Sequence, residues 1–150
     1  MSKLKKERIK LKPLHCGVSV PNIDESIAWY EEKLDFKLVY KKFMPFLNAH
    51  IAFLEHGSFS IELFEVLDGK PLPYERRIPN HDIKTHGTKH VAYAIEDMRS
   101  FAETLKALGV DFATEIMNIE NSLVLFIRDN AGNLIEFIEE GNNLETKYRS

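Results

Sequence analysis

The sequence contains an internal repeat about half a chain long, and this repeat constrains the fold more than any other feature. Residues 13–20, which include His15, resemble residues 87–95, which include His90. The two histidines lie 75 residues apart, at 15 and 90, and Glu62 and Glu136 recur 74 residues apart in two apolar segments. Since repeated segments fold as repeated structural units, the chain is expected to contain two copies of one module.

Alternating apolar residues and turn signals predict the same order of elements in each half. In the first half we expect strands over 14–20, 35–40, 49–55 and 59–66, and a helix capped by Asp24. In the second half we expect strands over 89–95, 110–114, 123–128 and 134–139, and a helix over 98–108 that ends at Gly109. The predicted fold is therefore α+β, with βαβββ modules at 13–66 and 88–140.

Three segments fall outside the modules: a basic leader (1–12), a linker (67–87) and a polar tail (141–150). The linker holds three of the six prolines and has little periodicity, so it is predicted to be a surface loop. Arg76, Arg77, His81 and His86 lie in it, either as plain surface residues or as part of a lid that contacts an anionic substrate.

The composition excludes several classes of protein. The net charge of -3 argues against a nucleic-acid-binding protein, and no apolar run reaches the ~18 residues of a membrane span. Cys16 is the single cysteine, so an internal disulfide is impossible. The basic leader lacks the apolar core of a secretory signal, so a cytoplasmic protein is expected.

The strands that carry the two histidines have one face of small or polar residues. His15 shares its face with Gly17 and Ser19, and His90 shares its face with Ala92 and Ala94. The strands of Glu62 and Glu136 are apolar on both faces, so their pattern leaves the direction of each carboxylate open. Two imidazoles and two carboxylates suit a divalent ion such as Zn, Ni, Co, Mn or Fe. Taken singly, a histidine early in a strand is more often a satisfied or exposed residue than a ligand. A glutamate in an apolar strand is more unusual, because an unpaired buried carboxylate is costly, although either glutamate could lie on the solvent face of an edge strand.

Several motifs together resemble the vicinal oxygen chelate superfamily, the glyoxalase / bleomycin resistance protein / extradiol dioxygenase group. They are His15–Val20, Ser26–Tyr30, Ile61–Leu63, His90–Tyr93 and Asp129–Glu136. The resemblance implies paired modules that form a curled mixed sheet around a metal cleft, and a homodimer. It also implies that His15, Glu62, His90 and Glu136 hold the metal. A carboxylate at Glu62 resembles glyoxalase I and not the ring-cleaving dioxygenases.

The resemblance implies a metal-dependent lyase or isomerase that acts on a small oxygen-rich metabolite. Glu136, or else Glu62, would move the proton, and His50 and Arg128 are further candidates for the substrate pocket. Ser19 stands where glyoxalase I has an arginine for glutathione, which counts against lactoylglutathione as substrate. The first and fifth strands are closer to methylmalonyl-CoA epimerase. An Fe(II) ring-cleaving dioxygenase and a drug-sequestering resistance protein are the alternatives.

Overall fold

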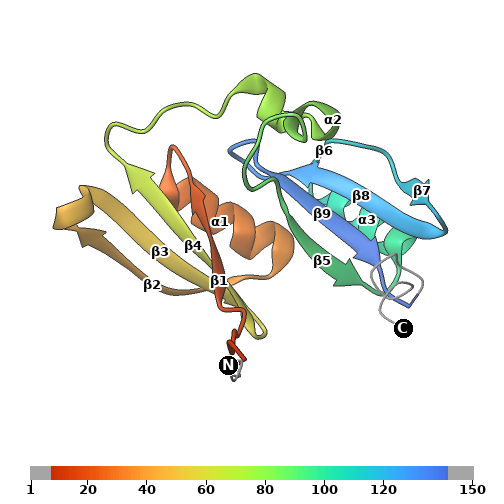
Figure 1. The fold of residues 1–150 in the computed structure, drawn as a ribbon, viewed down its shortest axis with the longest axis horizontal. Coiled ribbons are helices and arrows are strands. Elements are labelled where there is room, and N and C mark those ends of the chain that lie inside the picture. Colours follow the sequence, from red (N-terminus) through yellow and green to blue (C-terminus); the bar gives the residue numbers. More distant parts are fainter. Residues whose placement is uncertain (1–7, 142–150) are drawn as a thin grey trace, which may run out of the picture.

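The computed structural model describes residues 8–141 and has an α+β fold with two mixed sheets. This confirms the predicted fold class, with the strands divided between two separate sheets (Figure 1). Residues 1–7 of the predicted leader and residues 142–150 of the predicted tail lie outside the described residues. No helix among residues 8–141 is long and apolar enough to cross a membrane.

The first module forms a four-stranded sheet in the order β1-β4-β3-β2. Its elements are β1 (His15–Ser19), α1 (Ile23–Leu34), β2 (Lys37–Met44), a 3-10 turn (Pro45–Leu47), β3 (Ala49–His56) and β4 (Phe59–Val66). Strand β1 runs parallel to β4, so the first and last strands of the module are neighbours. The predicted strand over 35–40 starts two residues later and extends to Met44.

The second module repeats this plan in the sheet order β5-β9-β8-β6. Its elements are β5 (Val91–Ile95), α3 (Met98–Ala107), β6 (Asp111–Phe112), β7 (Met117–Ile119), β8 (Ser122–Arg128) and β9 (Leu134–Glu139). Strand β5 is parallel to β9, as β1 is to β4. Strand β7, which pairs with β8, was not predicted because it contains only three residues.

Both helices begin in the same way. Asn22 caps α1 and Asp97 caps α3, each accepting a bond from the backbone N–H three residues on. A glutamate from the last strand of each module adds a second bond: Glu65 Oε2 accepts from Ile23 N at 2.6 Å, and Glu139 Oε2 accepts from Met98 N at 2.9 Å. The predicted cap at Asp24 was wrong, because Asn22 holds that position.

One hydrophobic core joins the two modules. It contains residues from both helices and both sheets, among them Tyr30 and Phe36 from the first module and Leu105 and Phe137 from the second. Each Å² of apolar surface removed from water contributes about 25 cal/mol to stability, so such a shared core is the main stabilising term. The modules are therefore packed against each other through the sheet faces that carry the helices.

The linker is more ordered than predicted. After β4 it crosses from one sheet to the other (Figure 1) and forms a 3-10 turn (Tyr74–Arg77) and a short helix, α2 (Pro79–Asp82). Asp82 is buried and accepts bonds from Arg76 Nε at 2.9 Å and Lys89 Nζ at 3.3 Å. These contacts fasten the linker to the segment that enters β5.

Candidate metal-binding site

His15 and Glu62 lie side by side on one face of the first sheet. Strand register places Gly17 opposite Glu62, and His15 is two residues before Gly17, so the two side chains project from the same face. The distance from His15 Nε2 to Glu62 Oε2 is 3.2 Å. The apolar pattern of β4 left the direction of Glu62 open, and the pairing with β1 decides it.

His90 and Glu136 repeat this arrangement in the second sheet. Ala92 lies opposite Glu136, and His90 is two residues before Ala92, immediately before β5 begins. His90 Nε2 and Glu136 Oε2 are 2.8 Å apart. The two modules therefore repeat both the sequence pattern and the strand register that places one histidine beside one glutamate.

Each histidine also contacts a phenylalanine that the sequence analysis did not single out. The His15 ring meets Phe53 edge-on with centroids 5.2 Å apart, and His90 meets Phe126 in the same way at 5.0 Å. Phe53 lies opposite Glu62 and Phe126 lies opposite Glu136 in the strand pairing. An edge-on ring restricts the orientation of an imidazole. The repeat could have revealed these residues, since they stand at equivalent positions of equivalent strands.

The residue between each histidine and glutamate is small. Gly17 and Ala92 occupy the strand positions opposite the two glutamates, and no large side chain stands between the imidazole and the carboxylate. A Cβ at Gly17 would lie 3.2 Å from the ring of Phe64, so even alanine would crowd this position. The imidazoles keep 30% and 27% of their surface exposed, and the carboxylates 18% and 17%. Both pairs are therefore partly open to a ligand.

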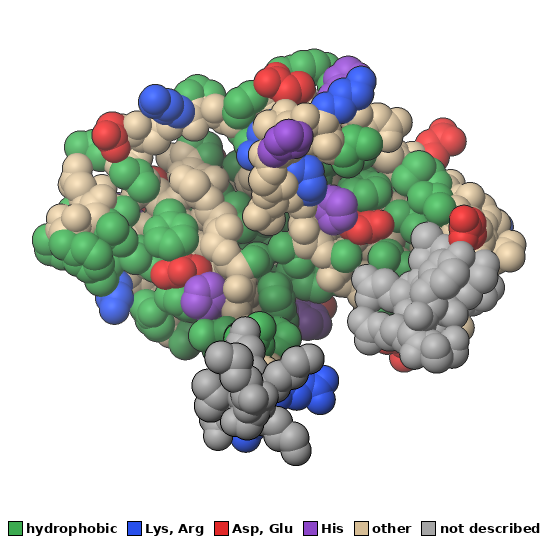
Figure 2. Space-filling view, in the orientation of Figure 1, with side chains coloured by type: hydrophobic (Ala, Val, Ile, Leu, Met, Phe, Trp, Pro, Cys, Tyr) green, Lys and Arg blue, Asp and Glu red, His purple; other side chains and the backbone are tan. Residues whose placement is uncertain are grey.

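The two pairs do not meet within one chain. No group of three or more histidine, cysteine, aspartate or glutamate side chains suited to a metal ion occurs among residues 8–141. Figure 2 shows histidine and acidic atoms adjoining at two separate places on the face in view. The donor atoms fit a divalent ion of the kind expected, but each sheet supplies only two of the four.

The two further pocket candidates lie apart from the pairs. His50 pairs with Glu65 across β3 and β4, which places it on the helix-bearing face of the sheet, away from Glu62, against the ring of Phe43. Arg128 is on the same face as Glu136, but its Nε donates to Arg77 O at 2.7 Å and its Nη1 to Asp111 at 3.2 Å. Neither side chain adjoins a histidine–glutamate pair.

Cys16 points into the core, opposite to His15. Burial raises the pKa of its thiol, so the thiol stays protonated at neutral pH. Burial likewise raises the pKa of Tyr30, with the Asp129 carboxylate adding to the shift, and raises the pKa of Tyr93. These groups therefore belong to the neutral interior between the modules, and the sulfur is not positioned as a ligand.

The profile of a known family covers most of the chain. The family described as the Glyoxalase/Bleomycin resistance protein/Dioxygenase superfamily matches residues 12–137, a range that includes all four predicted ligands. The chain belongs to this superfamily. The resemblance stated from the motifs is thereby confirmed.

Among characterised relatives are enzymes named lactoylglutathione lyase. The one from Haemophilus influenzae is 27% identical over 132 residues, which cover 84% of this chain and 90% of the relative. The one from Arabidopsis thaliana is 28% identical over 134 residues, covering 85% of this chain and 44% of the relative. This chain therefore spans less than half of the plant enzyme.

Solved structures of superfamily members share the fold. The trypanothione-dependent glyoxalase I of Leishmania major superposes with a TM-score of 0.70 at 22% identity, over 92% of this chain and 93% of that one. Glyoxalase I from Zea mays gives a TM-score of 0.69 at 24% identity, over 88% of this chain and 46% of that one. At these identities the likeness establishes the fold.

Proposed function

We propose that this protein is a metal-dependent lyase or isomerase of the glyoxalase type that acts on a small oxygen-rich metabolite. The observation that carries the proposal is the repeated pair, His15 beside Glu62 and His90 beside Glu136. In each pair the histidine lies two residues before the residue that is opposite the glutamate, and both side chains project from the sheet face that does not carry the helix. An edge strand that carried a chance histidine would have no reason to reproduce this register 75 residues later. Membership of the superfamily supports the same conclusion.

The complete site is proposed to need two copies of the chain. His15 and Glu62 of one copy would face His90 and Glu136 of the other, and the homodimer would hold two such sites. The shared core and the Tyr30–Asp129 hydrogen bond hold the modules of one chain in their present arrangement, which keeps the two pairs apart. Bringing them together within one chain would require breaking that core, whereas a second copy requires no such change.

Four such ligands leave one or two positions of a five- or six-coordinate ion for substrate oxygens. A divalent ion bound there would act as a Lewis acid and make a C–H next to those oxygens more acidic. Glu136 is the proposed base that takes this proton, with Glu62 as the alternative. Phe53 and Phe126 would hold the two imidazoles in place, and Gly17 and Ala92 would leave room beside the carboxylates.

The experiment measures metal content and turnover in the same preparations. Protein purified without chelator should contain stoichiometric Ni, Co, Zn or Mn, and chelation should abolish turnover. Lactoylglutathione is the first substrate to test because of the named relatives, alongside small hydroxy- and ketoacids followed by deuterium incorporation from D2O. No stoichiometric metal would favour sequestration, and Fe(II) with oxygen uptake would favour a dioxygenase.

Glu136→Gln tests whether Glu136 acts as the base, because it removes the proton-accepting carboxylate and keeps the shape of the side chain. Loss of a general base typically costs 10²–10⁴-fold in rate, so turnover should fall by about that factor even when metal is supplied in excess. Glu103→Gln, on the exposed side of α3, provides the matched control with the same change of charge. Full turnover by metal-loaded Glu136→Gln would rule out the role given to Glu136.

A further inference from the structure

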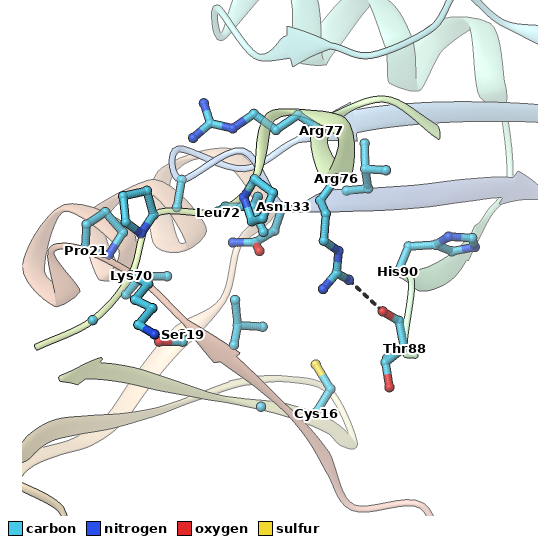
Figure 3. A pocket seen from close by; sticks show the side chains of 18 of the residues that line it. Cys16, Ser19, Pro21, Lys70, Leu72, Arg76, Arg77, Thr88, His90 and Asn133 are labelled. Carbon is cyan, nitrogen blue, oxygen red and sulfur yellow. Dashed lines mark hydrogen bonds between the residues drawn. The ribbon is translucent and has the colours of Figure 1, made fainter. Parts of the chain in front are cut away.

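A cleft of about 710 Å³ lies between the linker and the free edges of the two sheets. One wall is the edge of β1 from Cys16 to Pro21, and another is the segment Thr88–Val91 that leads into β5. Both β1 and β5 are the outermost strands of their sheets, so their outer edges are not paired within residues 8–141. The linker forms a third wall (Figure 3), and Ala131, Asn133 and Leu134, at and just before the start of β9, complete the lining.

The charge of this lining is one-sided. Among residues 8–141, four cationic side chains line the cleft and no aspartate or glutamate does: the cations are Lys70, Arg76, Arg77 and Lys89. The whole chain has a net charge of -3, so this concentration of positive charge runs against the overall balance. A concave site lined by one sign of charge attracts ligands of the opposite sign.

The four cations are not equivalent. Lys89 donates to Asp82 and to the carbonyl oxygen of Thr85, and Arg76 donates to Asp82 and to Thr88 O at 2.7 Å. The single carboxylate of Asp82 thus offsets one of these two charges and fixes both side chains. Lys70 and Arg77 have no carboxylate partner among the described residues. In Figure 3 the side chains of Lys70 and Arg76 both extend from the linker toward the space that Ser19 also lines.

The side chain of Arg77 lies against the turn between β8 and β9. Its Nε atom is buried and makes no hydrogen bond within residues 8–141. The atom packs over Gly132, where a Cβ would lie 2.9 Å from it. In Figure 3 the guanidinium of Arg77 points away from Lys70 and Arg76, so Arg77 packs against the turn at Gly132 and its buried Nε is not offered to a ligand in the cleft.

We propose that this cleft binds a small organic anion, a carboxylate or a phosphate, through Lys70 and Arg76. Arginine can hold either group with two parallel N–H donors. Apolar residues on the walls, such as Val20, Leu72 and Leu134, would take the carbon body of the ligand. His90 lies at the wall of the cleft, so a bound anion would reach the neighbourhood of one histidine–glutamate pair. Binding itself needs no metal ion.

The test is calorimetric titration at low salt of protein that has been freed of metal with EDTA and then dialysed to remove the chelator, because EDTA is itself a carboxylate anion. The probes are inorganic phosphate, malonate and the neutral malonamide, which separate phosphate from carboxylate binding and both from uncharged ligands. We expect saturable binding of at least one anion, one per chain, no binding of malonamide, and weakening by salt. Equal binding of malonamide and malonate, or no saturable binding of either anion, would overturn the proposal.

Matched variants locate the site. Lys70→Gln and Arg76→Gln should each weaken anion binding about tenfold or more, and Arg76→Lys should retain part of it. Arg99→Gln and Lys84→Gln remove the same charges from exposed positions that do not line the cleft, and should bind as the unaltered protein does. Equal weakening by the control variants would show general attraction and overturn the assignment. Because metal is absent throughout, the result is independent of the proposed metal chemistry.

Discussion

Tyr30 Oη donates a hydrogen bond to Asp129 Oδ2 over 2.8 Å and so ties the helix of the first module to the β8–β9 turn of the second. Both residues are buried, with 3% and 4% of their surface exposed. Oδ1 of Asp129 accepts from the backbone N–H groups of Ala131 and Asn133 at 2.9 Å each. Oδ2 also accepts from Asn133 Nδ2 at 3.0 Å, so both oxygens of the carboxylate bind the turn and one of them also binds the other module.

Replacing Tyr30 with phenylalanine removes this bond and keeps the packing. A hydrogen bond to a buried charged group contributes about 1.5–3 kcal/mol, so the free energy of unfolding should fall by about that amount. Urea titration measures it. Tyr74→Phe is the control, because the side chain of Tyr74 is 75% exposed. Equal stability of Tyr30→Phe and the unaltered protein would mean that water replaces the hydroxyl at Asp129.

The same tyrosine makes stability sensitive to alkaline pH. The folded-state pKa of Tyr30 is raised well above the ordinary value of 10.0, and that of Tyr93 is raised too, chiefly by burial. Below pH 10 both states keep the proton. Above it the unfolded chain loses protons that the folded chain retains, so stability falls by up to about 1.4 kcal/mol per pH unit for each group.

Urea titrations at about pH 8, 9.5 and 11 would follow this loss. Tyr30→Phe should lose less stability than the unaltered protein between the last two points, because one of the two shifted groups is gone. A parallel decline in both proteins would contradict the assignment of the loss to Tyr30.

The two glutamates at the helix starts permit a matched pair of tests. Glu65→Gln and Glu139→Gln keep an acceptor for Ile23 N and Met98 N but remove the negative charge at the positive end of each helix. We expect each to lower the free energy of unfolding by about 0.5–1 kcal/mol at low salt, and less at high salt. Glu31→Gln, on the exposed side of α1, should have almost no effect. A loss that salt does not reduce would point to hydrogen-bond geometry and away from charge.

The sequence predicted the order of the elements well, because it depends on local periodicity and on the repeat. It placed the cap of α1 at Asp24 where Asn22 holds it, since both residue types cap helices and only backbone geometry separates two neighbouring candidates. Strand β7 was too short to show a pattern. The face of Glu62 was open because Ile61, Leu63 and Phe64 are all apolar, and only the pairing with β1 decides it.

The contacts between modules were beyond the reach of sequence patterns. The hydrogen bond from the Tyr30 hydroxyl to Asp129 joins positions 99 residues apart, a distance that no local pattern spans. Arg128 was a candidate for the substrate pocket, whereas its guanidinium pairs with Asp111, and the neighbouring Asp129 is held by Tyr30. The four-ligand metal site stays a prediction. The structure brings His15 together with Glu62, and His90 together with Glu136.

That two-by-two arrangement leads to a test based on mixing two inactive variants. His15→Ala and His90→Ala each remove one ligand from every proposed site, so each variant alone should lose metal-dependent turnover. If the site is built from the first module of one copy and the second module of another, a mixed dimer has one site with both defects and one site with none. Random exchange of subunits puts half of the dimers in the mixed form, so about a quarter of the original activity should return.

The control is a mixture of His15→Ala with Glu62→Gln. Both changes lie in the first module, so every site in any dimer of these variants carries a defect and no activity should return. Recovery in the first mixture alone would demonstrate that two chains share the site. No recovery in either mixture, with subunit exchange verified by mass spectrometry, would mean that each chain builds its own site, and the shared core between the modules would then have to open before His15 and His90 could bind one ion.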